Sequence, residues 1–126
     1  MKIDFENLKP GEKARIIQEL VPGKQVTIAH IIANPDEILY KKLGLDPSVE
    51  YSKSAIGILT MSPAETAIIA GDISIKASGA QLGFVDRFSG TVILTGTYSE
   101  VEASLKAVTQ YAEETLGFTV CKITKT

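Results

Sequence analysis

The order of the elements predicted over residues 55–126 constrains the fold more than any other feature of the chain. Apolar runs bounded by turn residues predict strands at 55–60, 81–88, 91–98 and 118–125. One helix is predicted between the first two strands and another between the last two. This β-α-β-β-α-β order is the split pattern of ferredoxin-like α/β (α+β) domains. We therefore expect a mainly antiparallel sheet with both helices on one face, and either an extra helix or a neighbouring subunit covering the other face.

Both long helices are predicted from a start signal and an apolar stripe. The segments Ser62–Glu65 and Ser99–Glu102 each have the pattern of a capping box, and Pro63 suits a first helical position. The stripe of the first helix is made mostly of small residues: Ala64, Ala67, Ile68, Gly71 and Ile75. The stripe of the second helix repeats at steps of three and four: Val101, Leu105, Val108, Ala112 and Leu116. Gly117 is expected to end that second helix.

The first 44 residues are predicted to form a leader, two strands and a short helix. Residues 1–14 are polar and are expected to be a flexible leader, and a β-prone run at 15–21 is stopped by Pro22-Gly23. Asn34 is the predicted N-cap of a short helix that ends at Gly44. Between them lies a predicted strand at 26–33, with four side chains expected on one face: Val26, Ile28, His30 and Ile32.

Composition excludes several classes of function. The 126 residues suit one domain, and thirteen basic against fifteen acidic residues leave a net charge of −2 without a basic block for nucleic acid. No stretch approaches the ~20 apolar residues of a membrane span, and the amino terminus lacks the apolar run of a secretory signal. Cys121 is the only cysteine, so no internal disulfide can form. We expect a soluble intracellular protein.

The sequence shows no pattern that predicts catalysis, and no cofactor is expected. His30 and Cys121 are interpreted as structural residues, and they would form a nucleophile pair only if the fold brought them together. Intrachain thiolate metal sites are excluded, although a ring of identical chains would allow Cys121 residues to share a metal or an iron–sulfur cluster. The pair Asp86-Arg87 is interpreted as a local or intersubunit ion pair. The isolated glycine turns lack the spacing of a phosphate-binding loop.

Several segments together resemble the circularly permuted shell proteins of bacterial microcompartments. This family comprises the minor hexameric shell proteins of ethanolamine-, propanediol- and choline-utilisation compartments. The similar segments are Arg15–His30, Ala55–Thr60, Pro63–Asp72, Gly83–Gly90 and Cys121–Thr126. The resemblance implies a non-enzymatic structural tile in a cytoplasmic shell, built as a homohexamer that packs edge to edge with other shell proteins. It also implies that elements which close an ordinary shell domain at its carboxyl end stand near the amino end here.

The resemblance also implies roles for particular residues. Residues 15–23 would supply one strand of an intersubunit β-barrel that caps the central pore, and 24–126 would form the permuted shell domain. Lys76 matches the lysine at the edge of the hexamer. Ser54 stands where some relatives carry a glycine, so a bent ring that depends on that glycine is not implied. The pore loop corresponds to Phe88, Ser89 and Gly90, and the barrel strand to Arg15, Ile16, Ile17, Gln18, Glu19, Leu20 and Val21.

Two alternatives to a purely structural tile remain open at the level of sequence. The barrel strand alternates two apolar sets, Ile16 with Leu20 and Ile17 with Val21, and either set would let a barrel recruit a peptide of an encapsulated enzyme. The other alternative is a ferredoxin-like sensor or enzyme that binds a small molecule between subunits. This second alternative rests on topology alone.

Overall fold

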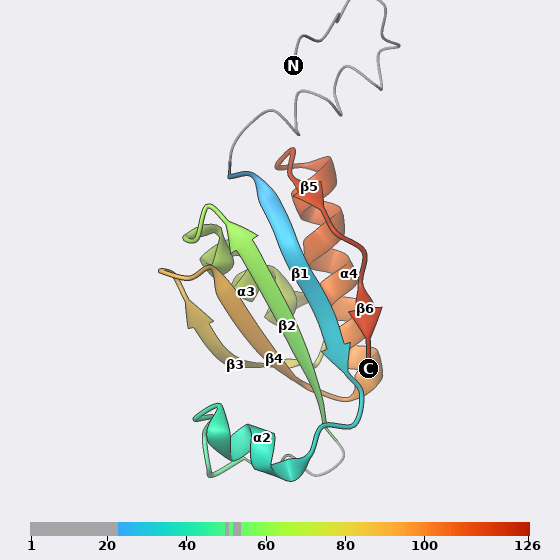
Figure 1. Ribbon diagram of the computed structural model, residues 1–126. Helices are drawn as coiled ribbons and strands as arrows, with labels where there is room; N and C mark the ends of the chain where they lie inside the picture. The colour runs from blue at the N-terminus through green and yellow to red at the C-terminus, as the bar shows by residue number, and fades with distance from the viewer. Residues whose placement is uncertain (1–22, 50, 52–53) are drawn as a thin grey trace, which may run out of the picture.

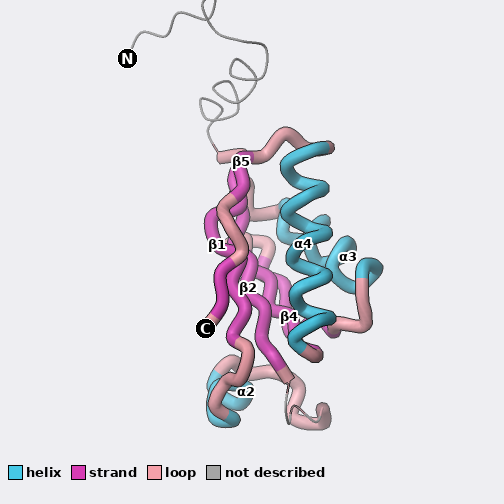
Figure 2. The backbone as a smooth tube through the Cα atoms, turned by 90° about the vertical axis from the view of Figure 1, so that its right-hand side faces the viewer, coloured by secondary structure: helices cyan, strands magenta, loops and turns pink. Residues whose placement is uncertain are grey.

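The computed structural model describes residues 23–49, 51 and 54–126, and these form one sheet with helices against it. The two long helices lie together on one face of the sheet, and the short helix α2 lies at one end (Figures 1 and 2). The helices are α2 (Glu37–Lys42), α3 (Thr66–Ala77) and α4 (Tyr98–Glu114). The strands are β1 (Gln25–Ile32), β2 (Ala55–Ser62), β3 (Gln81–Asp86), β4 (Thr91–Gly96), β5 (Thr119–Val120) and β6 (Thr124–Lys125).

The sheet has the strand order β3-β4-β2-β1-β5, and β6 also pairs with β1. The pairs β3–β4, β4–β2 and β2–β1 are antiparallel, whereas β5 and β6 run parallel to β1. The prediction of a mainly antiparallel sheet with both long helices on one face is therefore confirmed. Strand β1 precedes the β-α-β-β-α-β unit in the chain, yet it lies inside the sheet between β2 and β5.

The predicted final strand over 118–125 is interrupted. Residues 121–123 separate β5 from β6, and the break lies beside an irregularity in the pairing of β1 with β2. There the register shifts between Val26 and Ile28. A β-bulge of this kind locally disrupts the ladder and bends the strand.

The same bulge changes which side chains of β1 share a face. Val26, Ala29 and Ile31 are buried against the helices, whereas Ile28 is 46% exposed on the opposite face. The prediction that Val26 shares a face with Ile28 and His30 is therefore wrong. One extra residue in a strand reverses the alternation of the side chains beyond it.

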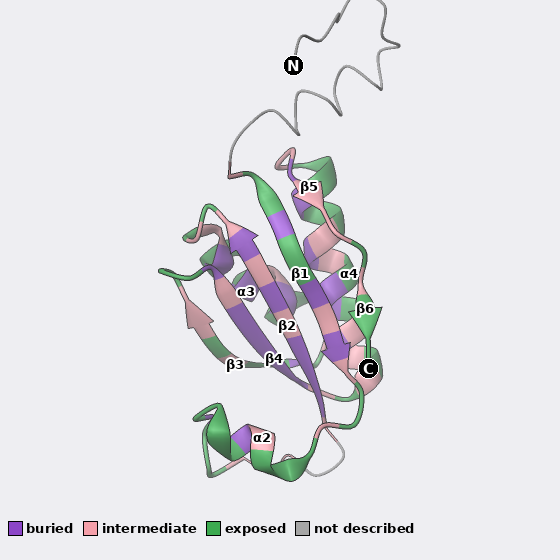
Figure 3. Ribbon diagram, viewed as in Figure 1, coloured by how far each residue is buried: buried purple, intermediate pink, exposed green. Residues whose placement is uncertain are grey.

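The main core lies between the sheet and helices α3 and α4, where the buried residues gather (Figure 3). The predicted stripe of α4 is confirmed, since Val101, Leu105, Val108 and Ala112 are all buried. The stripe of α3 is displaced from the predicted one. Ile68 and Ile75 are exposed, and the buried residues of α3 are Ala67, Ala70, Gly71 and Ser74.

A second cluster covers part of the other face of the sheet. Tyr40 of α2 and Leu45 pack against Ile56 of β2 and Ile93 of β4. The extra helix therefore supplies part of the expected cover, at one end of the sheet. Among the described helices, none combines the length and apolar character that a bilayer span requires.

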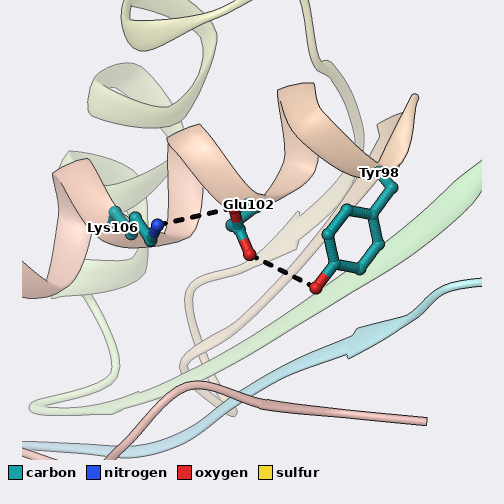
Figure 4. A network of polar contacts seen from close by, with 3 residues as sticks. All are labelled: Tyr98, Glu102 and Lys106. Carbon is teal, nitrogen blue, oxygen red and sulfur yellow. Dashed lines mark hydrogen bonds and ion pairs between the residues drawn. The ribbon is translucent and has the colours of Figure 1, made fainter.

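Helix α4 begins two residues earlier than its predicted capping box implies. Thr97 is the N-cap, accepting a hydrogen bond from the Glu100 amide, while the Glu100 carboxylate accepts one from the Thr97 amide. Glu102, the predicted partner of Ser99, instead accepts a hydrogen bond from the Tyr98 hydroxyl at 3.2 Å and pairs with Lys106 at 3.4 Å (Figure 4). Thr97 with Glu100 and Ser99 with Glu102 both have capping-box spacing. The first pair forms the box because β4 ends at Gly96 and the helix begins directly after it.

The other two helix starts also differ from the predictions. Ser62 is the last residue of β2, where it pairs with Gln25, so α3 begins only at Thr66 and has no side-chain cap. Helix α2 is capped by Asp36 rather than Asn34, because the Asp36 side chain accepts the hydrogen bond of the Ile38 amide. In both places the residue that was predicted as the N-cap belongs to the strand or turn before the helix, so it does not cap the helix.

Candidate functional site

The loop between β3 and β4 is held in one conformation by the residue that precedes it. The carboxylate of Asp86 accepts hydrogen bonds from the Phe88 amide at 2.9 Å and from the Ser89 hydroxyl at 2.8 Å. These bonds, the Phe88 amide first, lower the pKa of Asp86 below its usual value of 3.8 because they stabilise the charged form. The Gly90 amide donates to the Asp86 carbonyl at 2.9 Å. The loop is therefore ordered without help from another chain.

Gly90 requires its residue type for two reasons. Its φ of 77° lies in the left-handed region, which side chains disfavour. A Cβ at this position would also stand 2.1 Å from the Met61 carbonyl oxygen. Because the Met61 amide bonds to the Gly90 carbonyl at 2.8 Å, the loop is tied to the end of β2.

The loop presents Phe88 to the outside of the described domain. Phe88 is 82% exposed, more than any other large apolar side chain whose exposure is given, and the Arg87 guanidinium lies 4.9 Å from its ring centroid. The local ion pair interpreted for Asp86 with Arg87 is absent from the contacts of the described residues, since Asp86 bonds the loop and Arg87 stacks on the ring. An intersubunit pair stays a prediction.

An apolar groove of about 410 Å³ lies beside this loop, and we call it the loop groove. Ile68 of α3 and Leu82 of β3 are exposed apolar walls of this groove, at 54% and 42%. Its remaining lining residues are Gly71, Val85, Asp86, Arg87 and Phe88. Sequence reasoning assigned Ile68 to the core. One feature of the sequence could have predicted that Ile68 lies outside the core. Large apolar residues occur on more than one side of α3, which is typical of a helix that is buried on two faces.

Lys76 lies in the last turn of α3, on the molecular surface. Its ammonium is 2.8 Å from the Asp72 carboxylate, and the two side chains are 74% and 55% exposed. An exposed pair of this kind stabilises a fold by a few tenths of a kcal/mol at most in many proteins. Lys76 is therefore dispensable for the described fold and available to a neighbouring molecule.

His30 and Cys121 are not brought together as a nucleophile and base. The His30 ring contacts Thr124 through Nδ1 and Thr126 through Nε2, the latter at 2.9 Å, so both ring nitrogens have hydroxyl partners. Cys121 packs against the helix-side core, and burial raises the pKa of its thiol. A raised pKa lowers the thiolate fraction, which is the opposite of what a nucleophile needs.

A cavity of about 710 Å³ lies beside α2 and carries no catalytic arrangement of the described residues. Two stacked tyrosines, Tyr40 and Tyr51, line it with ring centroids 4.7 Å apart. The Tyr40 hydroxyl donates to the Ser54 carbonyl at 2.7 Å, and burial is the main cause that raises its pKa. Across the part of the chain that the structure covers, no cluster of three histidine, cysteine or carboxylate side chains could hold a metal.

The predicted barrel strand lies outside the described residues. Its members are Arg15, Ile16, Ile17, Gln18, Glu19, Leu20 and Val21. The first described residue is Gly23, two residues before β1.

Comparison with known proteins gives consistent matches in sequence and in structure. The model of the BMC domain matches residues 55–124. The bacterial microcompartment shell protein PduU of Salmonella typhimurium is 56% identical over 112 residues, which cover 89% of this chain and 93% of PduU. The shell protein EutS of the same organism is 50% identical, covering 90% and 97%. A solved flat hexamer of CutR has a TM-score of 0.77 and 44% identity, covering 84% of this chain and 94% of the CutR chain.

Proposed function

This chain belongs to the BMC-domain family of bacterial microcompartment shell proteins, and from that membership we propose that six copies form a ring which tiles into a microcompartment shell. The chain is a structural protein rather than an enzyme, as its shell-protein relatives are. Its place is the shell of a microcompartment in the bacterial cytoplasm. Other shell proteins are its proposed lateral partners.

The likeness to a chain solved as a flat hexamer carries the proposal of a ring. It extends over 94% of that CutR chain, so nearly the whole fold of a hexamer-forming chain is shared. The exposed apolar side chains of this chain support the same conclusion. Ile68, Leu82 and Phe88 lie close together around the loop groove, and clustered apolar surface is typical of an interface.

Circular permutation is proposed from the place of β1 in the sheet. The BMC-domain match begins at residue 55, so β1 and α2 precede it. Yet β1 pairs with β2 along its length and lies inside the sheet. A strand that belongs to the domain but precedes the matched segment is what moving the carboxyl-terminal elements to the amino end would produce. Residues 24–126 then make up the permuted domain.

The segment 15–23 is proposed to form one strand of a six-stranded barrel over the ring centre, after a leader at 1–14. The support is the resemblance of Arg15–Val21 to the barrel segment of this class. Closing a barrel across subunits pairs the edges that an isolated strand leaves open. The loop Phe88–Gly90 is proposed to line the centre beneath the barrel, and Lys76 to lie on the ring's outer edge.

Size-exclusion chromatography with light scattering tests the ring. The full chain should have the mass of six copies, and the variant without residues 1–23 should keep that mass, because every strand of the described sheet and the residues of the described core lie in 24–126. A full chain that stays monomeric in dilution series and in the presence of other shell proteins sinks the proposal. Loss of assembly only in the deletion variant refutes the separation of barrel from ring.

Docking of an encapsulated enzyme's peptide on the barrel is a second proposed role. It is motivated by the alternating apolar sets of 15–21, which would give a barrel an apolar surface for a peptide to contact. A pull-down of encapsulated enzymes with the full chain and with the variant lacking 1–23 tests it. Equal recovery from both proteins excludes this role while leaving the shell function untouched.

A further inference from the structure

Phe88 has the features of an interface anchor, although the guanidinium of the adjacent Arg87 lies over its ring. The side chain is 82% exposed, although the backbone beneath it is fixed by the hydrogen bonds of Asp86 and by Gly90. Holding a loop rigid before association removes part of the entropy cost of binding. Aromatic side chains presented in this way are the usual centres of interfaces.

The loop groove has the chemistry that a phenyl ring fits. Ile68 and Leu82 form apolar walls that water now contacts. At Gly71 helix α3 lies close to β3, since a Cβ there would stand 3.1 Å from Val85 and 3.6 Å from Leu82. Arg87 borders the groove, and its guanidinium already lies against an aromatic face. An aromatic ring entering the groove would bury these walls and meet the same cation.

Ring symmetry determines where a Phe88 side chain that enters the next groove must lie. In a ring of six the distance between equivalent atoms of neighbouring copies equals their distance from the axis. Phe88 itself borders the loop groove, so a Phe88 that fills the groove of the next copy must lie near its equivalent, and hence near the axis. The interface is heterologous, with a protruding residue on one copy and a groove on the next.

We propose that Phe88 of each subunit inserts into the loop groove of the next subunit, between its Ile68 and Leu82, and so forms an apolar collar around the ring centre. This inference rests on the proposed function, because it requires the ring and a loop that lines its centre. A collar of phenyl and aliphatic groups would make the centre unfavourable for hydrated ions. It would also act independently of residues 15–23.

Cross-linking tests the insertion directly. Cys121→Ser removes the only native thiol. Because Phe88 and Ile68 of one chain border the same groove, Phe88→Cys and Ile68→Cys are placed on separate, differently tagged chains that are co-expressed to form mixed rings. Treatment with a short bis-maleimide should yield a covalent pair that carries both tags. In the matched control Ile38→Cys replaces Ile68→Cys, at a residue of α2 with 52% exposure against 54% for Ile68. The control should yield no pair with both tags.

The same samples separate this inference from the proposed function. If light scattering finds six chains but the mixture of Phe88→Cys and Ile68→Cys chains forms no pair with both tags, Phe88 insertion is wrong and the ring stands. If light scattering finds single chains, the ring itself is wrong, and the insertion with it.

A dilution experiment gives a second measurement that needs no cysteine. We expect Ile68→Ser to raise the protein concentration at which the ring half-dissociates by about tenfold or more, as for a residue at the centre of an interface. Ile38→Ser should leave that concentration unchanged. Both residues are exposed in the single chain, so neither change removes a core contact. Equal behaviour of the two variants overturns the proposal.

Discussion

Two glycines of this chain have nearly the same backbone conformation in very different surroundings. Gly44 has a φ of 72° and Gly90 a φ of 77°. A Cβ on Gly44 would meet nothing within 4 Å, whereas a Cβ on Gly90 would collide with the Met61 carbonyl. Comparing them separates the cost of a left-handed backbone from the cost of crowding.

Gly44→Ala should lower the free energy of unfolding by about 1–2 kcal/mol, the cost of a side chain in the left-handed region. Gly90→Ala should cost about 1–3 kcal/mol more, because the loop must also shift away from β2. Urea unfolding of both variants measures the difference. Equal losses would show that crowding of the added Cβ against the Met61 carbonyl has no cost in stability.

The thiol of Cys121 should titrate above its ordinary value of 9.0, mainly because burial disfavours the thiolate. The native state then keeps this proton to a higher pH than the unfolded state, so the contribution of Cys121 to stability falls as pH rises above 9.0. Alkylation by iodoacetamide reports this group alone, since the chain has one cysteine. Its rate should rise with pH through a midpoint above 9.0 in the folded protein. A midpoint below that value contradicts the structure.

Among the secondary-structure elements, α4 shows how tertiary context chooses between equivalent local signals. Both Thr97 with Glu100 and Ser99 with Glu102 have capping-box spacing. Only the first pair forms the reciprocal bonds, because β4 ends at Gly96 and the chain must turn into the helix there. Glu102 is thereby left to bond Tyr98 and Lys106 on the helix surface.

Substitution of the two candidate caps distinguishes them. Thr97→Ala should lower the free energy of unfolding by about 1 kcal/mol, the usual cost of losing an N-cap side chain. Ser99→Ala, at an exposed residue without a capping bond, should change it by less than about 0.5 kcal/mol. Thermal unfolding followed by circular dichroism suffices for both. The reverse order of effects would place the helix start two residues later.

For the whole molecule, ring formation and tiling are expected to use different surfaces. The loop groove lies at the start of α3 with Ile68, whereas Lys76 lies at the end of the same helix. A helix of this length places its two ends well apart. Changes at one end should therefore affect one level of assembly and spare the other.

Lys76→Ala should leave the ring intact, because the side chain lies outside the core and its pair with Asp72 contributes little to stability. The substitution should abolish the edge-to-edge sheets, because Lys76 is proposed to lie on the outer edge of the ring. Lys106→Ala is the matched control, since Lys106 is also exposed and also paired at i,i+4. Light scattering reports the ring and electron microscopy reports the sheets. Sheets formed by Lys76→Ala as readily as by the control would exclude Lys76 from the tiling edge.

The sequence by itself determined the features that depend on local pattern. The order β-α-β-β-α-β, the buried stripe of α4 and the end of that helix near Gly117 all follow from periodicity and from glycine, which act within a few residues. The candidate loop was found from a resemblance, on residues 88–90. The exposure of Phe88 was beyond that resemblance, because it depends on where the rest of the domain lies. The bonds of Asp86 to Phe88 and Ser89 are local, and they were missed because Asp86 was interpreted as an ion-pair partner of Arg87.

Only the tertiary structure decided which of several compatible local choices is realised. The bulge in β1 exists through its pairing with β2, and it reverses the face of Val26 relative to Ile28. Ile68 fits a core stripe by spacing, yet the close packing of Gly71 on β3 leaves it outside. The periodicity of a sequence shows only how its apolar residues are spaced along the chain. Whether an apolar side chain faces its own sheet or another copy depends on neighbours distant in the chain, and those are brought close only by folding.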